Sequence, residues 1–382
     1  MAFVRRVVTG HDADGRAVFL SDGVPPKTID RGAQGVSEVL VLPGPPGDAT
    51  SGGDSPDPGF PLHPVAGGAT VRVIRLPPPA PGVPDDERWL RVAGDDPQRP
   101  GMHTTDTLDF EVIMDGEIVL DLEDGEHLLH AGDVVVQRGT PHRWRVSGDR
   151  PCTYLAVMVR PDQAAATAKT VTLAARKGNS AGSGSGSPAS SSEPGASSAG
   201  SAASSSGPAA AAASGPGSGS AGPGSPVGSG SGAALVPRRL VTGTDREGRS
   251  YAELDGHPAV VLQSPGPHGV GMSDLWQTGG PLSSVAQGGD AEGWQLEPIG
   301  GGMAFRMVEL SAGHDPGDAG WHTTETIDVD LILSGSMELS LPDIEPVVLE
   351  AGSVVIQRGT RHRWRPVGDQ PARMAAVMFG LG

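Results

Sequence analysis

The sequence predicts an all-β fold of two β-barrel or jelly-roll domains joined by a long disordered linker. The first observation is an internal repeat, because residues 132–145 and 352–365 share eleven of fourteen positions. The second is that short apolar runs recur at a spacing of about ten residues with glycine-containing turns between them, as in barrels and sandwiches. The third is a tract of Ser, Gly, Ala and Pro between the copies. A repeated unit indicates one fold used twice.

Each copy is expected to open with a strand that enters a hairpin. Residues 3–16 match residues 235–249, and apolar alternation in both leads to a glycine turn. Two interpretations are open for the arginine pair of each segment: solvation on an edge strand, or ion pairing at an interface between the units. The arginines are Arg5 and Arg6 in the first copy and Arg238 and Arg239 in the second.

The remaining elements follow in order along each copy. Proline and glycine are frequent in residues 17–66 and 250–300, which are expected to be loops, arms or lids. Residues 69–76 and 303–310 alternate cleanly and are expected to be barrel strands. The Pro-rich insertion within 77–100, absent from the second copy, is expected to be a surface excursion or a lid. Six further strands are expected at 108–114, 117–122, 126–130, 133–137, 142–146 and 152–159.

The low-complexity tract divides the chain into an N-terminal domain at 1–165, a flexible linker at 166–233 and a C-terminal domain at 234–382. Within this tract, residues 178–233 carry Glu193 as their only charge. Such a composition cannot bury enough apolar surface to offset the entropy lost on ordering. A short helix is expected at 160–176.

The composition excludes several classes of partner. The formal net charge is −17, which argues against nucleic acid and anionic membrane surfaces. No run of 18 apolar residues and no basic, apolar start is present, so neither a membrane span nor a secretion signal is expected. The single cysteine, Cys152, aligns with Ala372 and is expected to be a small buried residue. These features favour a cytoplasmic location.

Two segments of each copy resemble the paired motifs of the cupin superfamily. The first cupin motif is a glycine-led His-x-His, followed by Glu and a closing Gly. In both copies threonine stands in the place of the second His, and aspartate stands in the place of Glu. The matching positions are His103, Thr105, Asp109 and Gly116 in the first copy, and His322, Thr324, Asp328 and Gly335 in the second.

The second cupin motif is Gly, then Pro-x-Gly, then His, and here glutamine takes the place of proline with one residue fewer. The second glycine is expected to permit a turn that a side chain would block. The resemblance implies a bicupin whose two domains pair within the chain or as a homodimer. The matching positions are Gly132, Gln137, Gly139 and His142, and Gly352, Gln357, Gly359 and His362.

The candidate catalytic residues are expected on the inner face of each barrel. Side chains alternate along a strand, so the His, Thr and two acidic residues of each first motif share a face, which the cupin resemblance points inward. The histidine of the second motif is expected to face the same site. Paired acids inside an apolar barrel repel and lose hydration, which raises the pKa of at least one. The candidates are His103, Asp109, Glu111, His142, His322, Asp328, Asp330 and His362.

Three functions are open for these residues. In the first, they move protons on a bound small molecule, as in an isomerase, cyclase, dehydratase or decarboxylase of bacterial secondary metabolism. In the second, two histidines and one carboxylate bind Fe, Mn, Ni or Zn for dioxygenase or isomerase chemistry. In the third, the barrel only binds or senses a ligand. The metal sets would be His103, Asp109 and His142, and His322, Asp328 and His362.

Three further residues in each copy are candidates for contact with the small molecule. A threonine would donate a hydrogen bond, an arginine would clamp an anionic group, and a tryptophan would stack on a flat ligand. Their structural interpretations are strand formation, an ion pair at the turn, and core filling. The residues are Thr105, Arg138 and Trp144, and Thr324, Arg358 and Trp364.

Overall fold

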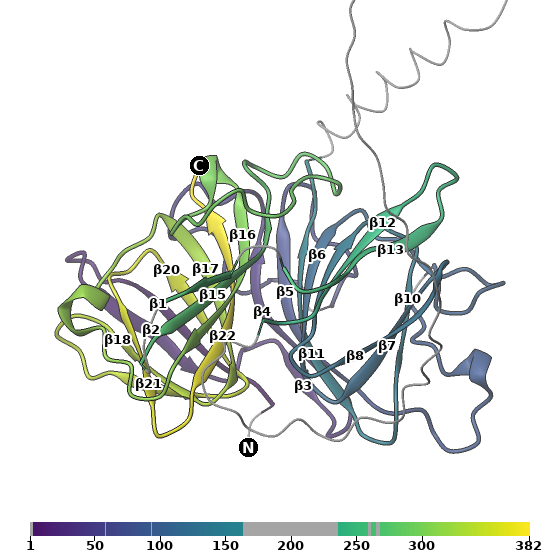
Figure 1. Ribbon diagram of the computed structural model, residues 1–382, viewed down its shortest axis with the longest axis horizontal. Helices are drawn as coiled ribbons and strands as arrows, with labels where there is room; N and C mark the ends of the chain where they lie inside the picture. Colours follow the sequence, from purple (N-terminus) through teal and green to yellow (C-terminus); the bar gives the residue numbers. More distant parts are fainter. Residues whose placement is uncertain (1–2, 58, 93, 163–235, 259–260, 265–267) are drawn as a thin grey trace, which may run out of the picture. The chain divides into compact units, whose positions relative to one another are not determined.

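The computed structural model describes residues 3–57, 59–92, 94–162, 236–258, 261–264 and 268–382 (Figure 1). Strands dominate this part of the chain, and its helical segments are three short 3-10 turns, η1 (Asp85–Glu87), η2 (Ile299–Gly301) and η3 (Gly317–Gly320). The all-β prediction is confirmed. The expected linker at 166–233, and the expected helix from residue 163 onward, lie outside the described residues.

The first barrel packs an eight-stranded sheet against a three-stranded sheet, with a buried apolar cluster drawn from both. The large sheet has the order β13-β12-β9-β6-β11-β5-β4-β3 and the small one the order β10-β7-β8. The bounds are β3 (Thr28–Asp30), β4 (Gly35–Leu42), β5 (Ala69–Leu76), β6 (Leu108–Asp115), β7 (Glu117–Leu122), β8 (Gly125–His130), β9 (Val134–Arg138), β10 (Arg143–Val146), β11 (Cys152–Val159), β12 (Arg239–Thr244) and β13 (Ser250–Gly256).

The second barrel repeats this arrangement. Its large sheet has the order β14-β15-β16-β22-β17-β20-β1-β2, and its small sheet the order β19-β18-β21. The bounds are β1 (Arg5–His11), β2 (Ala17–Gly23), β14 (Val261–Gln263), β15 (Val270–Gln277), β16 (Met303–Leu310), β17 (Thr326–Ser334), β18 (Ser336–Ser340), β19 (Val347–Glu350), β20 (Ser353–Arg358), β21 (Arg363–Val367) and β22 (Ala372–Gly380).

Every strand expected between residues 108 and 159 is found with ends within one residue of the prediction. The expectation of loops at 17–66 and 250–300 is wrong for part of each stretch, because β2, β3 and β4 lie in the first and β13, β14 and β15 in the second. The sequence GVSEVLVL of β4 is mostly buried in the core. The Pro- and Gly-rich segments on either side of β4 made its short apolar pattern hard to recognise in the sequence.

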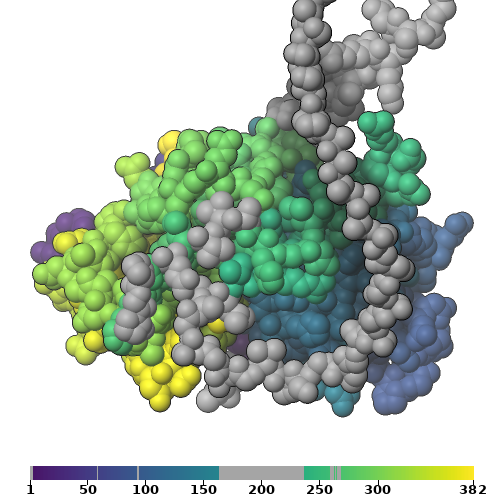
Figure 2. All heavy atoms as spheres, in the orientation of Figure 1, coloured from purple at the N-terminus to yellow at the C-terminus, as the bar shows by residue number. Residues whose placement is uncertain are grey.

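The two copies exchange their first hairpins within one chain. Strand β1 of the first copy pairs in parallel with β20 of the second, and β12 of the second copy pairs in parallel with β9 of the first. Figure 2 shows green atoms of the second copy against the blue atoms of the first. Pairing within the chain, one of the two expected arrangements, is therefore observed. The domain boundaries at 165 and 234 fall outside the described residues and stay a prediction.

The arginine pairs lie at these exchanged strands and not on a solvated sheet edge. Arg6 and Arg239 are 8% and 3% exposed and pair with Asp54 and Asp290 at 2.6 and 2.5 Å. Arg238 contacts the other copy, because its Nη1 donates to the carbonyl of Leu128 at 2.6 Å and lies 3.4 Å from Asp133. An ion pair between the copies is therefore found for Arg238, whereas Arg5, with a side chain 37% exposed, pairs with Asp22 of its own hairpin.

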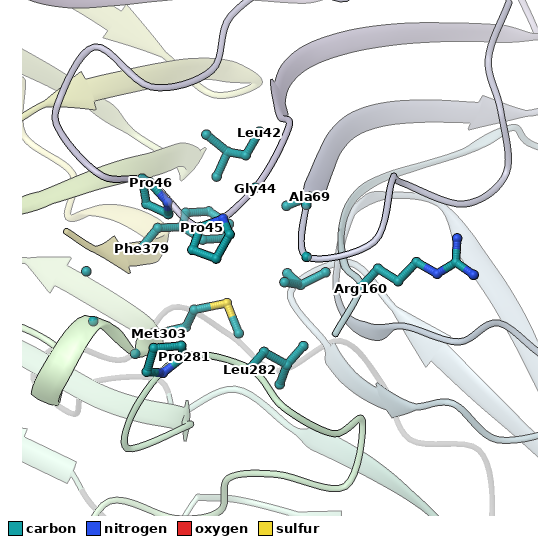
Figure 3. Close-up of a pocket in the computed structure, with 16 residues that line it drawn as sticks. Leu42, Gly44, Pro45, Pro46, Ala69, Arg160, Pro281, Leu282, Met303 and Phe379 are labelled. Atoms are coloured by element: carbon teal, nitrogen blue, oxygen red, sulfur yellow. The ribbon is translucent and has the colours of Figure 1, made fainter. Parts of the chain in front are cut away.

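A shared apolar core joins the two large sheets. It contains buried residues of both copies, and the rings of Phe110 and Phe305 lie 5.0 Å apart. Figure 3 shows a pocket at the margin of this core, lined by Pro45, Pro281 and other residues of both copies. Its volume of about 40 Å³ is room for about one water molecule. It is therefore too small to be the site for an organic ligand.

The insertion at 77–100 is anchored to the first barrel by Trp89, which is buried. The guanidinium of Arg143 lies 3.8 Å from the centre of the Trp89 ring, and the amide of Leu90 donates to the carbonyl of Trp144. The insertion is thus a surface excursion fixed to β10. Among the described residues, no helix reaches the length and apolarity needed to cross a membrane.

The closing glycine of each first motif is required by its turn. Gly116 and Gly335 have φ of 81° and 69°, and a Cβ at either would collide with the carbonyl oxygen of Pro151 or Pro371. We expect Gly116→Ala to destabilise the protein by about 2–3 kcal/mol, because strain and collision add. Gly132→Ala is the control, since Gly132 has φ of 94° but open space. Equal losses in urea unfolding would contradict this reading.

Candidate functional site

The two histidines of each barrel meet across an isolated bridge. The backbone amides of His103 and His142 donate to each other's carbonyls at 3.0 and 2.9 Å, and the ring centres lie 4.3 Å apart. His322 and His362 repeat this arrangement with ring centres 4.2 Å apart. The structure therefore brings together the histidines of the two motifs, as expected.

Backbone carbonyls hold the Nδ1 atoms of these histidines. Nδ1 of His103 lies 2.9 Å from the carbonyl oxygen of Gly101, and Nδ1 of His142 lies 2.9 Å from that of Thr140. Such contacts favour the tautomer with the proton on Nδ1, which leaves Nε2 as an acceptor. The same carbonyl contacts hold His322 and His362 in the second barrel.

Burial keeps the inner histidines neutral. Loss of hydration, together with the neighbouring His103, lowers the pKa of His142 to about 3. Burial and His322 lower the pKa of His362 to about 3 in the same way. Burial also lowers the pKa of His103. His142 and His362 therefore do not titrate near neutral pH, as a histidine that acts as a general acid or base would.

The acidic pairs of both barrels are buried. Burial raises the pKa of Asp109 to about 7, although a hydrogen bond from Thr105 Oγ1 at 3.3 Å opposes the shift. Burial and the neighbouring Asp109 raise the pKa of Glu111 well above its usual range. The expected increase in carboxyl pKa is thus observed for both acids of the first barrel.

The second barrel has the same pair with a shorter side chain. Burial raises the pKa of Asp328 to about 7, against hydrogen bonds from Thr326 and Thr324 and the charge of Arg306. Burial and Asp328 raise the pKa of Asp330 well above its usual range. In both barrels the expected hydrogen-bond donor, Thr105 or Thr324, therefore contacts the first acid.

A cavity of about 360 Å³ lies inside the second barrel. Its polar wall contains every catalytic candidate of this barrel, and most of its remaining wall is apolar. A cavity of this size suits a small organic molecule. The polar lining residues are Arg306, His314, His322, Thr324, Asp328, Asp330 and His362, and the apolar ones include Met272, Trp294, Leu296, Val308, Trp364, Met374 and Met378.

An inward ion pair in each barrel was missed from the sequence. Arg306 Nε lies 3.1 Å from Asp274 Oδ1, and Arg72 Nη2 lies 2.9 Å from Glu38 Oε2. Arg306 also donates to the carbonyls of Leu296 and Gln295, the loop beside the cavity. The available signal was arginine at the fourth position of both ATVRVIRL and MAFRMVEL.

The first barrel fills its interior with bulkier groups. Lys27 Nζ lies 2.8 Å from Glu38 Oε1 and 4.7 Å from the centre of the Phe60 ring. Tyr154 is buried where the second barrel has Met374, and it stacks on Trp144 with ring centres 6.3 Å apart. Trp144 thus serves as core, while Trp364 lines the cavity of its barrel.

The motif arginines face away from the barrel interiors. Gln137 shares the inward face with Asp109, its cross-strand partner, so the next residue, Arg138, points to the opposite side. Arg138 pairs with Glu253 at 2.5 Å, and Arg358 does not line the second-barrel cavity. The expected clamp on an anionic group inside the barrel is therefore not formed by either arginine.

The exchanged hairpins support the second-motif turns. Thr242 of β12 accepts hydrogen bonds from the amide of Arg138 and the hydroxyl of Thr140, both at 2.9 Å. Thr9 of β1 does the same for Arg358 and Thr360, at 3.1 and 2.9 Å. Each turn before a site histidine is thus held by a threonine of the other copy, which no local pattern in the sequence indicated.

The donor atoms that could hold a metal, which the cupin resemblance implies, come from the histidines and the first acid of each barrel. The Nδ1 contacts leave Nε2 of each histidine available, and Oδ1 of Asp109 and of Asp328 is buried without a hydrogen-bond partner. However, the described part of the chain contains no group of three or more His, Cys, Asp or Glu side chains placed to hold a metal ion. The side chains are therefore not arranged as a three-ligand metal site in this structure. A bound metal stays a prediction.

Comparisons with known proteins agree with the motifs. A family profile for the cupin domain matches residues 92–158. Phomopsin biosynthesis cluster protein C' of Diaporthe leptostromiformis is 33% identical over 156 residues, which cover 37% of this chain and 69% of that protein. A cupin-domain-containing oxidoreductase of Neurospora crassa is 28% identical over 152 residues, covering 38% and 74%.

Solved structures give a weaker likeness. AerE from Microcystis aeruginosa is 9% identical with a TM-score of 0.39, covering 93% of this chain and 97% of its own. An oxalate decarboxylase of Lactobacillus farciminis is 12% identical with a TM-score of 0.37, covering 93% and 84%. The paired motifs, the profile match and the curated relatives together show that the chain belongs to the cupin superfamily.

Proposed function

We propose that the protein is a cupin-type enzyme of secondary metabolism whose second barrel binds a small, mainly apolar molecule and moves protons on it. The observation that carries this proposal is the cavity of about 360 Å³, whose wall combines apolar side chains with all four catalytic candidates of that barrel. Support for the metabolic setting comes from the relatives named as biosynthesis cluster proteins and as a cupin-domain-containing oxidoreductase. These relatives are fungal, whereas the sequence favoured a bacterial pathway.

The two carboxyl groups share one proton in this proposal, because burial raises the pKa of both and they face each other. The pKa of Asp328, about 7, leaves a large fraction ionised at neutral pH, so this carboxylate is the proposed general base. Burial and the neighbouring Asp328 raise the pKa of Asp330 well above its usual range, so in this proposal Asp330 carries the proton and donates a hydrogen bond or a proton. Asp328 thus removes a proton from the bound molecule, and Asp330 stabilises the oxygen on which negative charge develops.

The histidines orient the molecule in this proposal. His362, with its pKa lowered to about 3, is too weak a base to hold a proton at neutral pH. Its Nδ1 lies 2.9 Å from the Thr360 carbonyl oxygen and 2.9 Å from Nε2 of Gln357, and in this proposal the proton is on Nδ1, so that Nε2 presents a lone pair to a donor group. A substrate with one hydroxyl or amine on an apolar frame would satisfy Nε2 and fill the cavity beside Trp364.

Deuterium exchange into an enolisable ketone tests the general base. In D₂O at pH 8, wild type is expected to exchange the α-protons of 1-tetralone faster than Asp328→Asn by at least tenfold, because the base is removed. The carbon–hydrogen bond breaks to Asp328, and a solvent deuteron replaces the proton, which ¹H NMR follows. Asp109→Asn, the same change in the first barrel, is the control and should keep the wild-type rate.

Elemental analysis separates this proposal from the metal alternative. Wild type and the His142→Ala/His362→Ala variant would be compared by inductively coupled plasma mass spectrometry. Near-stoichiometric Fe, Mn, Ni or Zn in wild type, lost in the variant, would favour metal chemistry on the two-histidine, one-carboxylate sets. Saturable tetralone binding with no exchange in any protein would favour the ligand-binding alternative and sink the acid–base one.

A further inference from the structure

Each exchanged hairpin meets the other copy along a seam, where β12 pairs with β9 in the first barrel and β1 pairs with β20 in the second. The internal repeat makes these two seams equivalent. In each seam the backbone amide of the arginine in the Gln-Arg-Gly-Thr turn donates to a threonine hydroxyl of the exchanged strand. Arg138 donates to Thr242, and Arg358 donates to Thr9. A second arginine of the exchanged strand lies in each seam and pairs with one aspartate: Arg239 with Asp290, and Arg6 with Asp54. The seams can therefore be compared residue by residue.

Arg138 has three partners in its seam. Its Nη1 lies 2.5 Å from Glu253 Oε2, and its Nη2 donates to the carbonyl of Ala286 at 3.3 Å. The guanidinium also lies 5.4 Å from the centre of the Trp276 ring. An acid, a carbonyl and an aromatic face together hold this side chain.

Arg358 lacks two of these three partners. Leu20 occupies the place of Glu253, because each lies over a glycine of the paired strand, Gly10 or Gly243. Leu40 occupies the place of Trp276, because each is the first paired residue after a shift in strand register. The shift lies between β4 and β5 in the first copy and between β15 and β16 in the second.

The carbonyl contact is the one that Arg358 keeps. Its Nη2 donates to the carbonyl of Gly52 at 3.2 Å, and within the described residues it forms no ion pair.

These replacements leave a cavity of about 150 Å³ in the Arg358 seam. Arg6 and Arg358 line it, with Ser21, Gly53, Asp54 and the apolar residues Leu20 and Leu40. Two arginines face one carboxylate here, which leaves an excess of one positive charge. The other seam sets Arg138 and Arg239 against Glu253 and Asp290, which leaves none.

We propose that the Arg358 seam cavity binds a small oxyanion, such as a phosphate or carboxylate group, between Arg358 and Arg6. Arginine forks match planar or tetrahedral oxyanions, and a partly buried, unpaired guanidinium gains from such a partner. This positive charge is confined to the cavity. The chain as a whole carries a net charge of −17, which repels anions from the rest of its surface. This site lies outside the barrel cavity and needs no assumption about the reaction there.

Isothermal titration calorimetry of the full chain with inorganic phosphate tests the site, at constant ionic strength set with chloride. Wild type is expected to bind one phosphate. Leu20→Glu supplies in the first hairpin the carboxylate that Glu253 supplies in the second, so it should weaken phosphate binding at least tenfold. Arg358→Gln should do the same. Arg138→Gln, the matching change in the paired seam, should keep binding within twofold of wild type.

A second titration with acetate distinguishes the source of the anion. Tighter binding of phosphate favours a phosphorylated ligand, and tighter binding of acetate favours a carboxylate ligand, and either supports the site. Circular dichroism melts without added anion would show that the variants fold. The proposal is overturned if neither anion binds saturably to wild type, or if folded Leu20→Glu and Arg358→Gln bind as wild type does.

Discussion

A chain that lacks residues 1–24 is expected to lose the fold of its second barrel, although that barrel's own repeat is intact. Strand β1 lies between β20 and β2 in the second sheet, and Val4, Val7 and Val8 are buried there or in the shared core. Each buried valine contributes about 1.5–3 kcal/mol, and a whole domain is stable by only about 5–15 kcal/mol. Loss of the cooperative transition in a circular dichroism melt would show the effect.

Complementation between fragments is the control for this deletion. Fragments 1–165 and 234–382 each lack the hairpin that completes their own large sheet, so neither is expected to fold alone. Expressed together, they supply β1 to β20 and β12 to β9, and a one-to-one complex should form on size exclusion. A stable, cooperatively melting monomer from either fragment alone would show that the opening hairpin can pair with its own copy, and it would contradict the requirement for exchange.

Local patterns were sufficient to predict the strands nearest the motifs. Strands β6 to β11 follow each other through short turns, and alternation with glycine punctuation placed each end within one residue. Strands β2 to β4 and β13 to β15 were missed because Pro and Gly in the intervening loops dilute the alternation. Their burial comes from packing against the other copy and against the neighbouring sheet, which a local pattern does not carry.

The hairpin exchange could not be predicted from the sequence. The opening segments of the two copies are nearly the same, and β9 and β20 are also alike, so pairing within a copy and between copies would satisfy the same residues. Three-dimensional placement also decided the roles of the arginines. Arg138 and Arg358 were expected inside the barrels, but one-residue alternation from Gln137 and Gln357 puts them in the seams.

The position of the candidate residues could be predicted, but not their chemistry. Parity along β17, with the cupin resemblance, predicted that the acids and histidines of the second barrel face one interior, and they line one cavity. It could not give the histidine pKa values, because these depend on how completely the barrel removes water from the rings. It also missed the Arg306–Asp274 pair at the cavity wall, which comes from two strands with no motif of their own.

Replacing Asp328 by Asn is expected to stabilise the protein at pH 8 and to leave its stability at pH 4 nearly unchanged. Burial raises the pKa of Asp328 from 3.8 in its ordinary state to about 7 in the folded chain. Folded wild type therefore keeps a proton that the unfolded chain releases, and it loses stability as pH rises from about 4 through about 7. The slope is about 1.4 kcal/mol per pH unit for one group, so asparagine should gain about 2–4 kcal/mol above the window.

His362→Asn is expected to change the free energy of unfolding on the acid side of the pH profile. The folded pKa of His362, about 3, lies below its ordinary value of 6.5. The unfolded chain therefore binds a proton that the folded chain refuses, and wild type loses stability as pH falls below about 6.5. Removing the imidazole should relieve that acid-side loss and leave the pH 8 value nearly unchanged. Urea unfolding at pH 4, 6 and 8 measures both variants, and a gain for Asp328→Asn that is equal at every pH would mean that packing, and not the buried proton, sets the difference.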